Sequence, residues 1–146
     1  MSEPSPDQLP DQPSTQPART SGGLGRVLIA VYAVFAVAAT GRSSIQLATH
    51  ASEAPVPYAL SALAGVVYVA ATLGLARRGA VWRRVAWIAV SVELVGVIGV
   101  GIVSVVHADW FPDDTVWSVF GQGYGYLPLV LPFLGIAWLL RTRAPR

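Results

Sequence analysis

The sequence predicts an all-α protein, a four-helix transmembrane bundle preceded by a disordered N-terminal tail. Three observations lead to this fold class. Apolar residues make up 53% of the 146 residues and charged residues only 12%, whereas soluble domains carry roughly 25% charged residues. The apolar residues fall into long runs separated by short polar segments. The basic residues are all arginine and gather at the borders of these runs, as membrane topology signals do.

Residues 1–23 form the predicted tail, which we place in the cytoplasm. The segment contains five prolines and little apolar sequence, so it buries too little surface to offset the entropy of ordering. Residues 24–146 form the predicted four-span transmembrane domain.

The first span is predicted at about residues 25–47. Its apolar run, Val27 to Ala39, follows Arg26 and ends in small residues, so cleavage after Ala38 as a signal peptide is an alternative. The long acidic, Pro-rich leader and the later apolar spans favour a retained helix.

The second span is predicted at about residues 57–76. Small residues recur four positions apart, at Ser61 and Gly65 and again at Ala70 and Gly74. Such spacing lets helix backbones approach closely in lipid.

The third span is predicted at about residues 85–106. Twenty-two residues separate Arg84 from His107, and only Glu93 among them is charged. A helix of that length spans the roughly 30 Å hydrocarbon core. A helical projection places Glu93 in a stripe of mostly small and polar residues: Ala86, Ala89, Gly96, Val100, Ser104 and His107.

The loop of residues 107–125 is acidic and contains no basic residue, so we place it outside. Its Phe111-Pro112-Asp113-Asp114 stretch is compatible with the start of a short interfacial helix. Four aromatic side chains are expected at the membrane–water border: Trp110, Phe111, Trp117 and Phe120.

The fourth span is predicted at about residues 125–140. Pro132 lies inside it and predicts a kink, which makes this the most deformable span. Nine of the ten arginines, all except Arg42, then lie on one side of the membrane. The positive-inside rule places that side, and both termini, in the cytoplasm. We expect the protein to lie in the plasma membrane.

Glu93 is the candidate site. An intramembrane acid requires a partner or a water-filled cavity, and the candidate partners are Arg42 and Gln46. Arg42, Gln46 and His50 are four residues apart and share one helix face beside Ser43. A structural Glu93–Arg42 pair is one interpretation, a proton-linked carboxylate is the other, and snorkelling of Arg42 to the headgroups remains a third.

No catalytic, cofactor-binding or metal-binding residue is predicted. The chain contains no cysteine, which excludes thiolate chemistry and Cys-ligated metals, and it contains no phosphate loop, dinucleotide fingerprint, HExxH or GxSxG motif. No basic groove interleaved with aromatic residues suggests nucleic acid. The group at His107, Asp109, Asp113 and Asp114 is more typical of a solvated acidic turn than of a metal site.

Three segments carry a resemblance to known proteins: GRSSIQLATHASEAPVPYALSALAGVVYVAATLGLA, ELVGVIGVG and DWFPDDTVWSVFGQGYGYLPLVLP. They resemble small four-span integral membrane proteins of actinobacteria. The resemblance extends from about Arg42 to Leu140 and implies location and fold, without assigning a role to any residue.

Two functions remain open from the sequence. The first is a non-enzymatic accessory or assembly component of the cell envelope, with the lipid bilayer and a homo-oligomer or larger membrane complex as partners. The alternative is a small proton-coupled transporter, working as an oligomer and using Glu93. A transporter requires a water-accessible cavity at Glu93, whereas an accessory protein can bury it in a dry contact.

Overall fold

A computed structural model describes residues 20–142. They form four α-helices and two short 3-10 helices, and no strand occurs among them. The elements are, in chain order, α1 (Thr20–His50), α2 (Pro55–Ala76), α3 (Ala80–Val106), η1 (Ala108–Trp110), η2 (Ser118–Tyr124) and α4 (Leu127–Arg141). The predicted all-α, four-helix fold class is confirmed.

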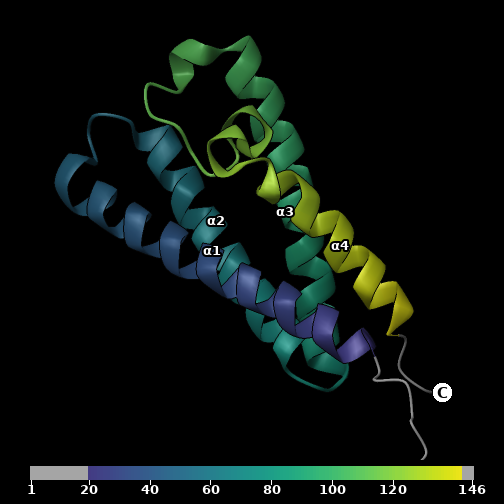
Figure 1. Cartoon of the computed structure of the whole chain (residues 1–146). Helices are drawn as coiled ribbons and strands as arrows, with labels where there is room; N and C mark the ends of the chain where they lie inside the picture. Colours follow the sequence, from purple (N-terminus) through teal and green to yellow (C-terminus); the bar gives the residue numbers. More distant parts are fainter. Residues whose placement is uncertain (1–19, 143–146) are drawn as a thin grey trace, which may run out of the picture.

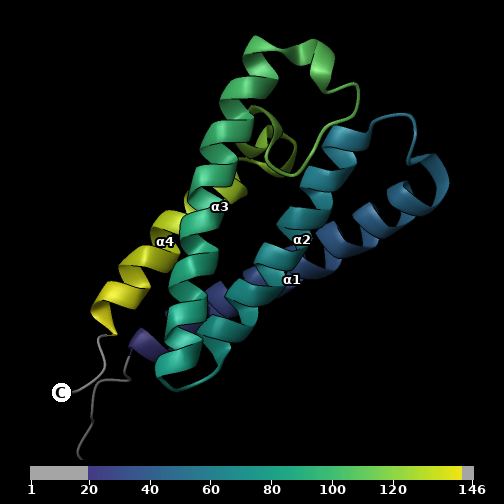
Figure 2. The same cartoon turned by 180° about the vertical axis from the view of Figure 1, so that it is seen from behind.

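The helices follow one another up and down along one axis (Figures 1 and 2). The start of α1, the α2–α3 turn and the end of α4 lie at one end of the molecule (Figure 1). The loops after α1 and α3 lie at the opposite end. We call these the arginine end and the loop end, because Arg26, Arg77, Arg78, Arg83, Arg84 and Arg141 occupy the first.

Three helices are long and apolar enough to cross a membrane, and η2 with α4 makes a fourth span if the bent pair is counted as one. The predicted first three spans therefore lie within α1, α2 and α3. With 31 residues, α1 is about 46 Å long and exceeds the ~30 Å hydrocarbon core. These helices are compatible with a small multi-pass membrane protein.

Two boundaries differ from the prediction. Most of the predicted tail, residues 1–19, lies outside the described residues. Residues 20–23 belong to α1, so Gly22 and Gly23 do not prevent helix formation ahead of the apolar run. Helix α3 begins at Ala80, earlier than predicted. Its first turns include Arg83 and Arg84, whose long stems suit a helix at a membrane border.

The fourth span is the main departure. Helix α4 has 15 residues, about 22 Å, which is less than the hydrocarbon core. The chain bends by 98° between η2 and α4, around Gly125 and Tyr126, and Pro132 lies inside the assigned helix. The chain therefore turns at the end of the glycine series, and α4 continues as a helix through Pro132, where the kink stays a prediction.

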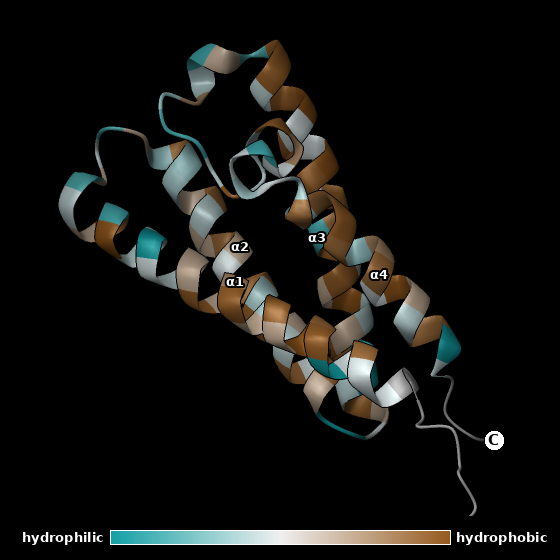
Figure 3. Cartoon of the chain, viewed as in Figure 1, coloured by the Kyte–Doolittle hydropathy of each residue, from teal (hydrophilic) through white to brown (hydrophobic). Residues whose placement is uncertain are grey.

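Hydrophobic residues occur along all four helices (Figure 3), and a few polar side chains are buried in a mainly apolar core. Glu93 and Ser61 are buried, whereas the side chains of Val37 and Val95 are 75% and 73% exposed. Extensive exposed apolar surface of this kind is uncommon on soluble monomeric proteins. The exposed aliphatic side chains of all four helices therefore suit contact with lipid.

Close helix contacts occur where small residues were predicted to permit them. A Cβ on Gly65 would lie 3.0 Å from Thr40 Oγ1 of α1, and a Cβ on Gly74 would lie 2.6 Å from the Ala86 backbone nitrogen of α3. The small residues of α2 thus set its distance to both neighbours. Ala70 instead lines a groove.

Candidate functional site

Glu93 is fully buried at the centre of the bundle. It lies on the inner face of α3, whose buried residues are Ala86, Ala89, Val90, Glu93, Val97, Gly101 and Ser104. The predicted surroundings of small and polar residues are confirmed for Ala86, Ala89 and Ser104. His107, beyond the helix end, is exposed instead and stacks on Trp110.

The partner of Glu93 is a tyrosine. The Tyr32 hydroxyl of α1 donates a hydrogen bond of 2.6 Å to Glu93 Oε2, across 61 residues of sequence. Tyr32 is itself fully buried, and its hydroxyl lies close to Gly135 of α4, where a Cβ would be 3.3 Å away. The contact therefore joins α1 to α3 and depends on a glycine in α4 for space.

A second buried hydrogen bond lies beside the first. Trp117 Nε1 donates to the Tyr68 hydroxyl of α2 at 3.0 Å, and the rings of Tyr32 and Tyr68 are 6.1 Å apart. Trp117 reaches this depth because Gly96 leaves room in α3: a Cβ there would be 2.6 Å from the indole. Three helices and the segment that carries Trp117 thus meet around Glu93.

That segment has an unusual backbone. Val119, Phe120 and Tyr126 have positive φ angles, which non-glycine residues rarely adopt. Side chains hold the turn: Ser104 Oγ accepts the Val119 amide at 2.8 Å, and Ser118 Oγ accepts the Thr115 amide at 2.8 Å. Strain of this kind persists only where surrounding contacts impose it.

The predicted Glu93–Arg42 pair is wrong. Arg42 donates to the Tyr124 hydroxyl at 3.1 Å and to the Asp114 carbonyl at 2.8 Å, so it joins α1 to the loop end. Glu93 Oε2 is occupied by Tyr32, and Oε1 has no hydrogen-bond partner among the described residues. The physical reason is depth, since Arg42 lies too far towards the loop end to reach the centre of α3.

The other predicted polar residues lie near Arg42. Gln46 is half-buried, and its Oε1 is buried without a hydrogen-bond partner in the described part of the chain. Ser43 is buried and donates to the Thr40 carbonyl, whereas His50 is exposed beside Thr49. The face containing Arg42 and Gln46 is therefore turned inward, and it is not joined to Glu93.

The acidic loop is arranged around interhelical contacts. The Tyr58 hydroxyl donates to Asp113 Oδ2 at 2.5 Å, and Asp114 contributes its carbonyl to Arg42. No group of three or more His, Cys, Asp or Glu residues positioned to hold a metal ion occurs within residues 20–142. Residues 112–114 are not helical, so the predicted interfacial helix is wrong in position, and the short helices η1 and η2 flank it.

Trp117 and Phe111 were expected at the membrane border and are buried instead, with Trp117 only 1% exposed. Trp110 is 56% exposed, in keeping with the prediction. An indole buried in a membrane protein needs an acceptor for its N–H group, and Tyr68 provides it. The prediction failed because the loop folds back into the bundle.

The comparisons with known proteins give no match: no family model, no curated protein and no solved structure is similar to this chain.

Arg42→Gln is expected to lower the free energy of unfolding by about 1–2 kcal/mol, because it removes two hydrogen bonds from a charged donor at a partly exposed site. Backbone amides between Asp114 and Tyr124 should exchange hydrogen faster in nanodiscs. Arg26→Gln, an exposed arginine on the same helix, is the matched control. The losses from Arg42→Gln and Glu93→Gln should add, since the two sites share no contact, and a large coupling between them would contradict this geometry.

Proposed function

We propose that the protein is a non-enzymatic accessory or assembly component of the cell envelope, anchored in the plasma membrane. The enclosure of Glu93 carries this proposal. Its carboxyl group is 0% exposed and hydrogen-bonded to Tyr32, and it lines neither the cavity at the arginine end nor the groove along α2. A buried contact between Glu93 and Tyr32 supports a role in holding α1 to α3 rather than in moving protons.

The exterior is compatible with protein association as well as with lipid contact. Exposed aliphatic and aromatic side chains lie on different helices, including Val37 on α1, Ile88 on α3 and Phe133 on α4. Membrane helices associate through such faces by packing and small-residue contacts. We therefore place the partner, a second copy or another membrane protein, on one of them.

Photo-crosslinking tests the association. A photoreactive residue is placed singly at Val37, Ile88 or Phe133 in the full chain, which is then purified from native membranes after illumination. We expect a discrete protein adduct from one face and only lipid adducts from the other two, and mass spectrometry then names the partner. Absence of a protein adduct from all three faces contradicts the accessory role.

One observation favours the alternative, an oligomeric proton-coupled transporter. Glu93 Oε1 has no hydrogen-bond partner among the described residues, and unsatisfied buried polar atoms are uncommon. Transport additionally requires water at that atom. The reactivity of an Ala89→Cys variant towards a thiol reagent therefore distinguishes the two functions.

The topology is proposed from the arginine end. A reporter fused after Arg146 is expected to be cytoplasmic, and one inserted beside Asp113 external, because cationic border residues stay in the cytoplasm. An external reading at Arg146 contradicts this topology.

The origin in actinobacteria stays a prediction.

A further inference from the structure

A basic hollow of about 710 Å³ lies at the arginine end. Residues of the α2–α3 turn line one side, and residues at the end of α4 line the other. Its charged lining consists of four arginines: Arg77, Arg78, Arg83 and Arg84. Trp87, Trp138 and Thr142 line it as well.

The arginines of the hollow fall into two pairs. Arg83 is structural, because it donates to the Leu139 and Thr142 carbonyls at the end of α4. The guanidinium of Arg77 covers the ring of Trp82 at 4.3 Å. Arg78 and Arg84 are exposed and make no side-chain hydrogen bond with any residue of the range 20–142.

Within that range the positive charge is not balanced locally. Its carboxylates are Glu53, Glu93, Asp109, Asp113 and Asp114, of which Glu93 is in the core and the others lie at the loop end. A hollow with two fixed and two available guanidinium groups suits a phosphate group, because arginine binds phosphate oxygens through two parallel hydrogen bonds. Basic pockets between membrane helices on the cytoplasmic side, where the proposed topology places the arginine end, bind anionic headgroups.

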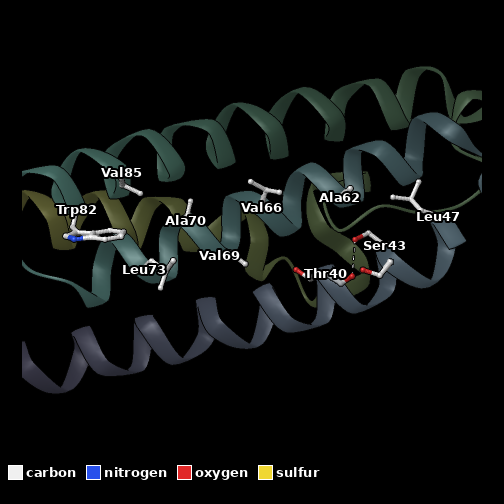
Figure 4. Close-up of a pocket in the computed structure, with 11 residues that line it drawn as sticks. Thr40, Ser43, Leu47, Ala62, Val66, Val69, Ala70, Leu73, Trp82 and Val85 are labelled. Carbon is white, nitrogen blue, oxygen red and sulfur yellow. Dashed lines mark hydrogen bonds between the residues drawn. The ribbon is translucent and has the colours of Figure 1, made fainter.

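An apolar groove begins beside the hollow. It has a volume of about 550 Å³ and is lined by Thr40, Ser43, Ser44, Leu47, Ala62, Val66, Val69, Ala70, Leu73, Trp82 and Val85. Figure 4 shows these side chains arranged along α2, with Trp82 near one end and Leu47 near the other. Along α2 it extends from Leu73 to Ala62, about 17 Å, which is close to half of a ~30 Å hydrocarbon core.

The hollow and the groove share no lining residue and are linked through one side-chain pair. Arg77 lines the hollow, and the Trp82 ring beneath it lines the groove. A ligand for both features needs an anionic head and an apolar chain about one leaflet long. A free phosphate satisfies only the hollow, and a transmembrane helix of a partner satisfies only the groove.

We propose that the protein binds an anionic glycerophospholipid, with the phosphate in the arginine hollow and an acyl chain in the groove. The lipid comes from the leaflet on the arginine side. This site is independent of the accessory role and does not involve Glu93.

Lipid retention by the purified full chain tests the proposal. Protein in mild detergent is mixed with equal amounts of phosphatidylglycerol and phosphatidylcholine, and bound lipid is counted by native mass spectrometry. The test variant is Arg78→Gln with Arg84→Gln, and Arg78→Lys with Arg84→Lys keeps the charge. Arg26→Gln with Arg141→Gln is the matched control, since both arginines are exposed at the same end and neither lines the hollow.

We expect preferential retention of phosphatidylglycerol, weakened roughly tenfold or more in the glutamine variant, because each arginine near an anionic surface contributes about fivefold. The control should stay within about threefold of the native chain. The Lys variant should lie between the control and the glutamine variant, because lysine keeps the charge but loses the two parallel hydrogen bonds. Ala70→Phe, which fills the groove, should also reduce retention. Equal retention of both lipids, or equal losses in variant and control, overturns the proposal. Full displacement by soluble glycerol phosphate also overturns it, because the ligand would then be a free phosphate.

Discussion

Tyr32→Phe is expected to lower the free energy of unfolding by about 2–3 kcal/mol. The change removes the hydrogen bond to Glu93 Oε2 and leaves both oxygens of a fully buried carboxyl group without a donor among the described residues. An unsatisfied buried group loses its solvation without compensation, and the loss is larger for ionisable groups. Denaturation by SDS or heat in a mild detergent measures the change.

A double-mutant cycle isolates the contact. Glu93→Leu removes the group that needs a donor, so Tyr32→Phe should cost only about 1 kcal/mol in that background. We expect a coupling energy of about 1–2 kcal/mol, at the upper end of the range for hydrogen bonds between membrane helices. Tyr124→Phe makes the same chemical change at the loop end and should show no coupling with Glu93→Leu. Purely additive losses from Tyr32→Phe and Glu93→Leu contradict the contact.

Gly74→Ala is expected to destabilise the protein by about 2–3 kcal/mol, and Gly74→Val by more. The added Cβ would lie 2.6 Å from the nitrogen and 2.8 Å from the Cα of Ala86. Both are backbone atoms of α3, so the clash is relieved only when α2 and α3 separate. Overpacking of this kind typically costs about 1–3 kcal/mol and occasionally more.

Substitutions at two other glycines serve as controls for Gly74→Ala. A Cβ added at Gly99 would have no neighbouring atom within 4 Å, so Gly99→Ala should be neutral or stabilising by up to about 1 kcal/mol. Gly65→Ala meets the Thr40 side chain at 3.0 Å, which gives an intermediate loss. Equal effects at Gly74 and Gly99 would show that α2 and α3 are not in backbone contact.

The fold was predictable because lipid imposes a simple rule on the sequence. Apolar runs long enough to cross the membrane, separated by short polar segments, are sufficient to locate α1, α2 and α3. The fourth span was harder to predict. The loop before it contains three glycines, Gly121, Gly123 and Gly125, and two of these take positive φ angles, so hydropathy alone does not reveal that this segment turns back into the bundle.

The position of the site was predictable, but its predicted partner was wrong. An acid within an apolar helix identifies Glu93 without further information. Charge complementarity favours Arg42 as the partner of Glu93, whereas depth along the helices favours Tyr32. Counted from the nearest border arginines, Glu93 is nine residues deep and Tyr32 six, whereas Arg42 is sixteen.

The buried position of Trp117 could not be predicted from a single sequence. An aromatic residue in an outer loop is usually at the membrane border, and here it fills the core above Glu93. The only signal is on another helix, where Gly96 and Gly101 leave space for Trp117 and Phe120. Pairing a small residue with a distant large one requires knowledge of which helices are neighbours.

Access of water to Glu93 tests the central claim most directly. The chain contains no cysteine, so Ala89→Cys, one turn from Glu93 and only 4% exposed in the native chain, reports on this region alone. We expect this cysteine to stay unreactive towards a small membrane-impermeant thiol reagent added from either side of intact membranes, while Asp109→Cys in the loop reacts fully. Reaction at Ala89→Cys from either side would reveal a water path to Glu93 and contradict a sealed structural contact.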